Sequence, residues 1–230
     1  MADKDPQKIY LAGRLSYPTF TAELAYERSK GSTYPAKSVA DAAPGYNIIV
    51  EQAQFEKLYN FAKDVFLPSR SQLDPDHKQY LSPKEVKQLI EQMDVRANGV
   101  DTVDFEGVFN LPVKAVSAKT KLLAPEGYAS VTVRGNKGTD IELKAIVMDE
   151  DELDPPDPTQ IKFPVVKDID ETKHKLLPGY IVTVAGNLYA YHNGKNPGFS
   201  LGSNVCIFKA KADQFGGGGA IDEDELFADD

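Results

Sequence analysis

The chain has 230 residues, 41% of them hydrophobic and 27% charged, which suffices for one sizeable globular core or two small ones. Its net charge of −9 comes from two acidic blocks with six acids each, at 149–157 and 222–230, so the remainder is mildly basic. The single cysteine, Cys206, excludes an intramolecular disulfide, and the polar start "MADKDPQK" and short apolar runs predict a cytoplasmic protein without signal peptide or membrane span.

The first third of the chain predicts two strands and a helix. "KIYLAGRLSY" (8–17) alternates, with Ile9, Leu11 and Leu15 on its buried face. A stretch of small residues and prolines (29–44) precedes a second strand, "GYNIIVEQ" (45–52). Apolar residues then recur at helical spacing over 53–66, and Pro68 is expected to end this helix.

A second helix and a run of strands follow. Ser82, Pro83 and Glu85 form the start signal of a helix over 82–93. From residue 128 the period changes to two: "YASVTVRG" is predicted to pair with "DIELKAIVM" (140–148) across a turn at Gly138. Two more strands flank the turn "HNGKNPG" near the end. The pattern predicts a mainly β protein with inserted helices, most simply an OB-fold-like small barrel.

Aromatic and cationic side chains share the faces of these strands that are expected to point outward. Tyr10 accompanies Arg14, Tyr128 accompanies Arg134, and Tyr189 and Tyr191 lie opposite the buried face of strand 180–191. Single-stranded nucleic acid offers π-faces to stack and phosphates to neutralise, so this combination suits its binding. The alternative is that the tyrosines only cover a sheet edge or pack beneath a loop.

The end of the chain, "GGGGAIDEDELFADD", predicts a flexible linker followed by an acidic tail over 213–230. An acidic tail can compete with phosphates for a basic surface, and Leu226 and Phe227 add an apolar anchor for a protein partner. The alternative is a tail that serves solubility alone. The residues expected to bind a partner are Asp222, Glu223, Asp224, Glu225, Leu226, Phe227, Asp229 and Asp230.

Four segments, "GRLSYPTF", "YNIIV", "LLPGYIVTVAGNLYAYHN" and "GFSLGSNVCIFKA", together with the Gly-rich acidic end, resemble the phage-encoded OB-fold single-stranded DNA-binding proteins. The resemblance covers about half of the chain. It implies one domain over 1–212, an insertion at about 68–126, and a role in phage DNA replication or recombination in the host cytoplasm. Many members end on an aromatic residue, whereas here "ADD" follows Phe227.

Two rival readings concern metal binding and catalysis. The segment 74–109 follows the spacing of an EF-hand, but Lys78 and Gln79 occupy positions that need an oxygen ligand and a glycine. The three histidines are scattered, and neither a G-x-S-x-G nor a GK[ST] phosphate loop is present. Cys206 stands among apolar residues and is predicted to lie in the hydrophobic core.

The sequence therefore predicts a non-enzymatic protein that coats single-stranded DNA, needs no cofactor or metal, and recruits replication or recombination proteins through its tail. A calcium-responsive or structural interaction protein using 74–109 is the alternative. The residues expected to contact DNA are Tyr10, Arg14, Tyr128, Arg134, Lys137, Tyr189, Tyr191 and Lys195.

Overall fold

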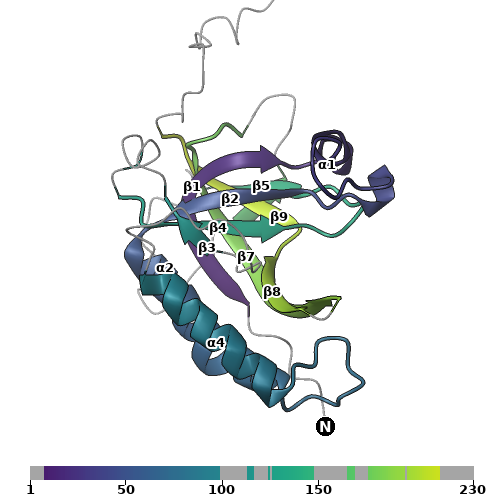
Figure 1. The fold of residues 1–230 in the computed structure, drawn as a ribbon. Coiled ribbons are helices and arrows are strands. Elements are labelled where there is room, and N and C mark those ends of the chain that lie inside the picture. Colours follow the sequence, from purple (N-terminus) through teal and green to yellow (C-terminus); the bar gives the residue numbers. More distant parts are fainter. Residues whose placement is uncertain are drawn as a thin grey trace, which may run out of the picture.

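A curled β-sheet forms the centre of the molecule, and helices line one side of it (Figure 1). The computed structural model describes residues 8–98, 113–116, 124, 126–147, 165–168, 176–194 and 196–212. Five strands of this sheet build a barrel: β1 (Ile9–Thr19), β2 (Gly45–Val50), β4 (Ala129–Arg134), β7 (Ile181–Asn193) and β8 (Asn196–Gly202).

The barrel closes through one parallel pair. Strands β1–β2, β2–β4, β7–β8 and β1–β7 pair antiparallel, and β4 pairs parallel with β8, where Val133 faces Leu201. A five-stranded barrel with these pairings is an OB-fold, so the predicted fold class is confirmed. In this fold β2 and β4 occupy the places of the second and third barrel strands.

The predicted alternation of buried residues is correct in all three barrel strands that carried it. The residues predicted to face the core are all buried: Ile9, Leu11 and Leu15 on β1, Ala129, Val131 and Val133 on β4, and Val182, Val184 and Leu188 on β7. Two residues expected on the outer face, Ser16 and Ser130, are buried as well. For Ser130 the reason is the short strand β3 (Val113–Ala115), which pairs along β4 and covers this position.

The helix predicted over 53–66 begins as α2 (Gln52–Phe61) but does not end before Pro68. It continues through a π-helical turn (Ala62–Phe66) into α3 (Leu67–Arg70), and Phe55, Leu58 and Phe66 pack into the core. Proline lacks an N–H and crowds the turn before it. The wider π turn lies directly before Pro68, so the chain accommodates the ring without leaving the helical path.

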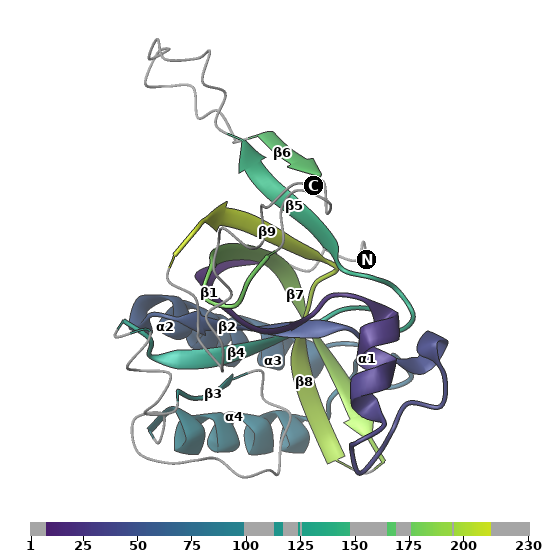
Figure 2. The same ribbon diagram turned by 90° about the horizontal axis from the view of Figure 1, so that it is seen from above.

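The pairing predicted for 128–134 with 140–148 is wrong. β5 (Glu142–Val147) pairs instead with β9 (Val205–Ala210) and with β6 (Val165–Asp168), on a part of the sheet that extends away from the barrel (Figure 2). The intervening turn is held elsewhere, because Gly138 N donates to Ala42 O at 2.8 Å and Ile141 N to Phe20 O at 2.8 Å. The edges of β4 are meanwhile occupied by β2, β3 and β8.

The last predicted strand divides at Ser203 into β8 and β9, which continue in different parts of the sheet. The Ser203 hydroxyl donates to Ala185 O at 2.9 Å and accepts from Val205 N at 3.2 Å, and Ser203 N donates to Arg134 O at 3.0 Å. These bonds satisfy the backbone at the bend. β8 can therefore close the barrel against β4 while β9 supports β5.

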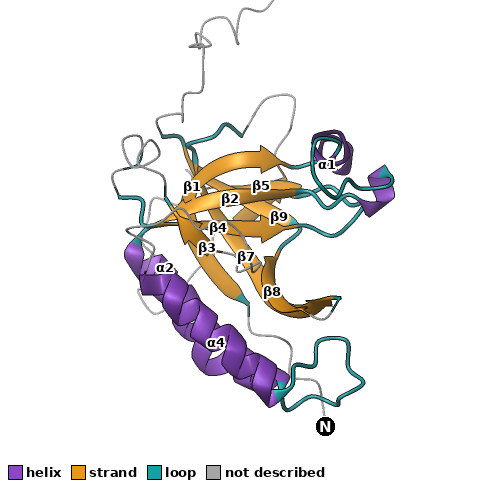
Figure 3. Cartoon of the chain, in the orientation of Figure 1, coloured by secondary structure: helices purple, strands orange, loops and turns teal. Residues whose placement is uncertain are grey.

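Helix α4 (Pro83–Asn98) begins where the sequence predicts it. Ser82 N donates to Glu85 Oε2 at 2.8 Å and Glu85 N to the Ser82 hydroxyl at 3.4 Å, which is a capping box. Glu85 Oε1 lies 3.0 Å from His192 Nε2 on β7. Figure 3 shows α4 together with α2 beside the sheet.

Replacing Ser82 with alanine should lower the free energy of unfolding by about 0.5–2 kcal/mol at neutral pH, because the cap is lost. Burial raises the pKa of Glu85, but hydrogen bonds from Ser82 and His192 outweigh it and leave the pKa below its ordinary value of 4.5. A lowered folded-state pKa stabilises the fold above about pH 4.5, and this contribution disappears as pH falls through the lowered value. Urea unfolding of the wild type and of Ser82→Ala between pH 3 and 7 should show that the difference in their free energies of unfolding becomes smaller as the pH falls.

If this difference does not change with pH, the ionised Glu85 carboxylate does not take part in the cap.

Candidate nucleic-acid interface

A groove lies between the β1–β2 connection and the adjoining ends of β1, β2 and β4. The connection carries α1 (Ala22–Ser29) and a short 3-10 helix (Val39–Asp41), neither of which the sequence predicted. The groove encloses about 1040 Å³, and Gly45, Asn47 and Thr132 belong to the barrel strands that line it. We call it the first groove. In OB-folds, this strand face and the loop between the first two strands are where oligonucleotides and oligosaccharides bind.

The first groove is basic. Arg28, Lys37, Arg134 and Lys137 line it, and Asp41 is the one acid among the described residues that do so. Asp41 Oδ2 accepts a hydrogen bond from the Ser38 hydroxyl at 2.9 Å. Arg28 is held in place, because its Nη1 donates to Pro18 O at 3.0 Å and to the Thr19 hydroxyl. The net positive lining attracts an anionic ligand.

Two highly exposed tyrosines border the same groove. Tyr17 is 76% exposed and Tyr34 is 90% exposed, and both line the cavity. Tyr17 has a φ of 47°, in the left-handed region that a tyrosine rarely adopts, where the β1–β2 register shifts between Ser16 and Thr19. Backbone outliers of this kind cluster at ligand-binding and active sites, which makes Tyr17 a candidate contact residue. The two rings offer stacking surfaces beside the four cations.

A second cavity, of about 680 Å³, lies over the outer side of β7 and β8. Arg134 lines this second groove as well as the first, and Arg70, Gln79 and Tyr189 form part of its wall. The ring of Tyr189 lies across Gly202 on β8, where an added Cβ would come within 3.0 Å of Cε1. Glycine therefore allows the ring to lie close against the strand.

Four of the residues predicted to contact DNA lie in or beside these grooves. Arg134 and Lys137 line the first groove and Tyr189 lines the second. Tyr191 stands next to Tyr189, with ring centroids 6.0 Å apart and an angle of 43° between the planes. The structure thus gathers these residues around the β4–β8 side of the barrel.

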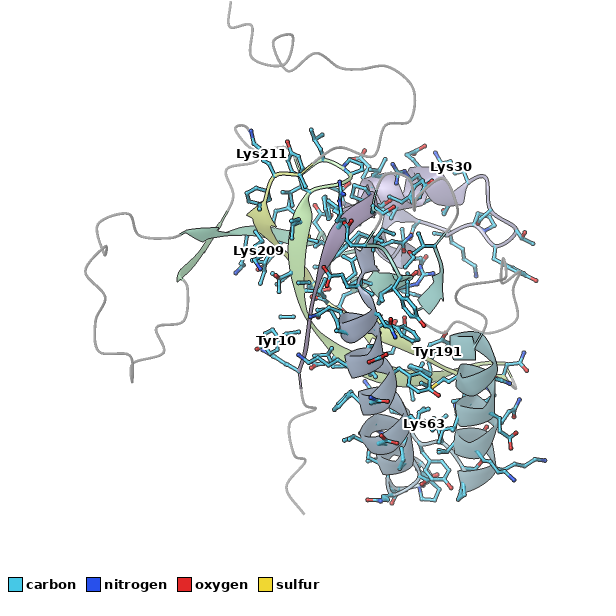
Figure 4. All side chains as sticks on the ribbon, turned by 90° about the vertical axis from the view of Figure 1, so that its left-hand side faces the viewer. Tyr10, Lys30, Lys63, Tyr191, Lys209 and Lys211 are labelled. Atoms are coloured by element: carbon cyan, nitrogen blue, oxygen red, sulfur yellow. The ribbon has the colours of Figure 1, made fainter. Side chains whose placement is uncertain are left out.

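Three other predicted contact residues lie elsewhere. Tyr10 is 53% exposed and pairs with Ala185 on β7, about 20 Å along that strand from Tyr191 at 3.3 Å per residue. Figure 4 shows Tyr10 and Tyr191 apart from one another. The Arg14 side chain is only 12% exposed, donates to Gly179 O at 3.0 Å and pairs with Glu126 at 3.4 Å.

The third of these residues, Tyr128, packs against the core, with its ring centroid 5.2 Å from that of Phe55. It therefore acts as cover for the barrel rather than as part of either groove. Lys195, the acidic block 149–157 and the tail 213–230 lie outside the described residues.

Sequence reasoning missed Tyr17, Tyr34, Arg28 and Lys37. Tyr17 ends the alternating segment 8–17 at a position that the period of two assigns to the buried face, but it lies at the register shift after Ser16 and is exposed. The other three lie in the β1–β2 connection, where no apolar period singles out a face. One signal was available: "SYPTF" and "TYPAK" both place a tyrosine before a proline among small polar residues. A proline restricts the residue before it, so a Tyr-Pro pair presents the ring from a restricted backbone.

No catalytic or metal site emerges from the described part of the chain. Among those residues, no three His, Cys, Asp or Glu side chains gather as metal ligands would. Cys206 is fully buried, as the sequence predicted, and burial raises its pKa to about 12. A thiol with that pKa is not a nucleophile at neutral pH. None of the helices in the described part combines the length and apolar character needed to cross a membrane.

Fold and groove together define an OB-fold barrel with a basic, tyrosine-bordered cleft on the face where such barrels bind their ligands. No protein-family model and no curated protein sequence matches the chain. Among solved structures, it is similar to the single-stranded DNA-binding protein from bacteriophage Enc34, at 10% identity over 95% of this chain and 89% of that chain, with a TM-score of 0.42. The same protein in complex with ssDNA is similar at 10% identity over 94% and 97% of the two chains, with a TM-score of 0.41.

A second phage protein is similar at the same level. It is gp2.5, a single-stranded DNA-binding protein encoded by bacteriophage T7, at 9% identity over 93% of this chain and 96% of that chain, with a TM-score of 0.45. Sequence identities of about 10% and TM-scores below 0.5 do not show that the chain belongs to a family. The function is therefore inferred from the side chains that line the grooves.

Proposed function

We propose that the chain binds single-stranded DNA in the first groove without catalysing a reaction. The observation that supports this most strongly is the combination of four cations and two highly exposed tyrosines along one cleft of an OB-fold. Oligosaccharides, the other common ligands of this fold, carry no regular charge to match such a lining. Bases stack on aromatic rings whatever their sequence, and the phosphates meet the cations.

The aromatic and the cationic side chains of the first groove are proposed to bind different parts of the DNA. Tyr17 and Tyr34 stack on bases, while Arg28, Lys37, Arg134 and Lys137 neutralise the backbone. Because neither contact depends on the identity of the base, the protein coats DNA with little sequence preference. Tyr189 lines the second groove and Tyr191 stands next to it, and their role in binding stays a prediction. Tyr10, Arg14 and Tyr128 lie outside both grooves, and their role in binding stays a prediction.

We further propose that the acidic tail 213–230 modulates DNA binding and recruits replication or recombination proteins. The support comes from its sequence: six acids match the basic groove, and Leu226 and Phe227 provide an apolar anchor within them. This gives a coating protein a means to keep its groove occupied without DNA and to expose a docking segment once DNA is bound.

The decisive experiment is a mobility shift with single-stranded and duplex DNA of equal length. Stacking needs unpaired bases, so the single strand should bind and the duplex should bind more weakly. Tighter binding to duplex DNA than to the single strand, or binding to neither, would contradict the proposal.

The contacts of Glu85 weigh against the calcium-responsive alternative. The bidentate position of the EF-hand spacing is Glu85, whose carboxylate accepts from Ser82 at 2.8 Å and pairs with His192 at 3.0 Å. At another ligand position, Asp74 Oδ1 accepts from Asp76 N at 2.9 Å. Calorimetric titration with calcium should therefore give no binding heat.

Replacing both Arg134 and Lys137 with glutamine should reduce the salt dependence of DNA binding. Each phosphate contact to a single strand contributes about −0.7 to the slope of log K against log salt, so the slope should become less steep by about 1.4. Affinities measured by fluorescence anisotropy at several salt concentrations give the slope. Lys87→Gln on α4 is the matched control, because that exposed lysine lines neither groove and pairs with Glu91. An unchanged slope in the double variant would exclude both side chains from phosphate contacts.

A further inference from the structure

We propose that the bound strand does not end in the first groove but continues past Arg134 into the second groove, so that residues 70–79 extend the DNA site. This inference rests on the proposed function. Arg134 lines both cavities, so the two adjoin at this residue on the β4–β8 side of the barrel, and a strand leaving the first groove there would meet the second. The insertion thus gains a role in binding, through the segment that joins α3 to α4.

The segment 70–79 is fixed against the barrel by a shared side chain. Gln79 Oε1 accepts from Arg70 Nη1 at 3.4 Å and from Ala190 N on β7 at 3.3 Å. The Arg70 guanidinium also lies 4.8 Å from the ring centroid of Phe66, within cation–π range. Arg70 is therefore oriented in advance at the wall of the second groove, which lowers the entropic cost of binding a phosphate.

The lining of the second groove repeats the chemistry of the first. Arg70 and Arg134 supply positive charge, Tyr189 supplies a ring backed by Gly202, and no acid occurs among the described residues that line it. His77 adds a polar group, with Nδ1 accepting from Gln79 N at 3.1 Å. One aromatic ring and two arginines in the lining of one cavity suit one stacked base and its adjacent phosphates.

The geometry makes a specific prediction about length. A short oligonucleotide can bind entirely within the first groove, whereas a longer one also reaches the second groove. The test measures binding of oligo(dT) over about 4 to 16 nucleotides, the range of site sizes known for one OB-fold. Arg70→Gln should leave the affinity for the shortest bound oligonucleotides unchanged and weaken the longest about fivefold. Tyr189→Leu, which keeps apolar cover over Gly202 but removes the ring, should follow the same length dependence.

The controls separate this inference from the function on which it rests. Lys87→Gln should bind like the wild type at every length, and thermal melting should show that each variant is folded. A second readout needs no variant: an oligo(dT) carrying one 5-iodouracil should photo-crosslink to Tyr189 only when the oligonucleotide is long. If Arg70→Gln and Tyr189→Leu lose the same affinity at all oligonucleotide lengths, or lose none at any length, the strand does not continue into the second groove. The proposed binding in the first groove would be unaffected by that result. No binding of any oligonucleotide to the wild type would instead overturn the proposed function.

Discussion

Replacing both Tyr17 and Tyr34 with alanine is expected to weaken single-stranded DNA binding by about 2–6 kcal/mol, which is about 30-fold to more than 10⁴-fold. Each base stacked on an aromatic ring contributes about 1–3 kcal/mol. Both side chains are mostly exposed, so their loss removes almost no buried area and should leave the melting temperature nearly unchanged. Fluorescence anisotropy with a labelled oligo(dT) measures the affinity.

Two comparisons make this result specific. Phenylalanine at both positions keeps the rings and should keep most of the affinity, because stacking does not need the hydroxyls. Tyr10→Ala removes an exposed tyrosine that lies in neither groove, so we expect little change in the affinity for single-stranded DNA. If Tyr10→Ala weakens binding and the double variant does not, DNA lies on the face that the sequence pattern suggested, and the first groove is not the site.

The barrel could be predicted from the sequence because its strands carry a clear period of two. The buried faces of 9–15, 129–133 and 182–188 follow directly from alternating aliphatic residues, and a small closed barrel is a simple way to bury them together. Strand pairing was less accessible. The turn at Gly138 looks like a hairpin locally, but its hydrogen bonds go to Phe20 and Ala42, about a hundred residues earlier in the chain.

The binding site was only half predictable for a related reason. Residues on strands have faces that a period reveals, so the sequence could single out Arg134 and Tyr189, which line the grooves of the proposed site. The β1–β2 connection has no such period, and its contribution depends on how α1 and the 3-10 helix fold it over the barrel. Arg14 lies in neither groove, because an outward position on a strand does not ensure exposure: Gly179 and Glu126 engage its guanidinium. Tyr128 lies in neither groove because helix α2 covers that face and brings Phe55 against the ring. A role for either residue in DNA binding stays a prediction.

Truncation after Gly219 should strengthen DNA binding, which is the opposite of what loss of a terminus usually does. It removes six acidic residues and, by our proposal, a competitor for the first groove. A segment tethered by a short flexible linker acts at an effective concentration of about 1 mM. A tail that binds the groove with a Kd of about 0.1 mM would then occupy it about nine-tenths of the time and weaken DNA binding about tenfold.

Salt and a point variant distinguish competition from other effects of the tail. The gain on truncation should be largest at low salt and should shrink as salt rises, because screening weakens the attraction between tail and groove. Phe227→Ala keeps all six charges, so it should leave DNA affinity nearly intact while impairing capture of a replication protein, for which the ring is the anchor. Truncation that weakens DNA binding at low salt would show that the tail assists the groove. The acids would then have to act on something other than the four cations that line it.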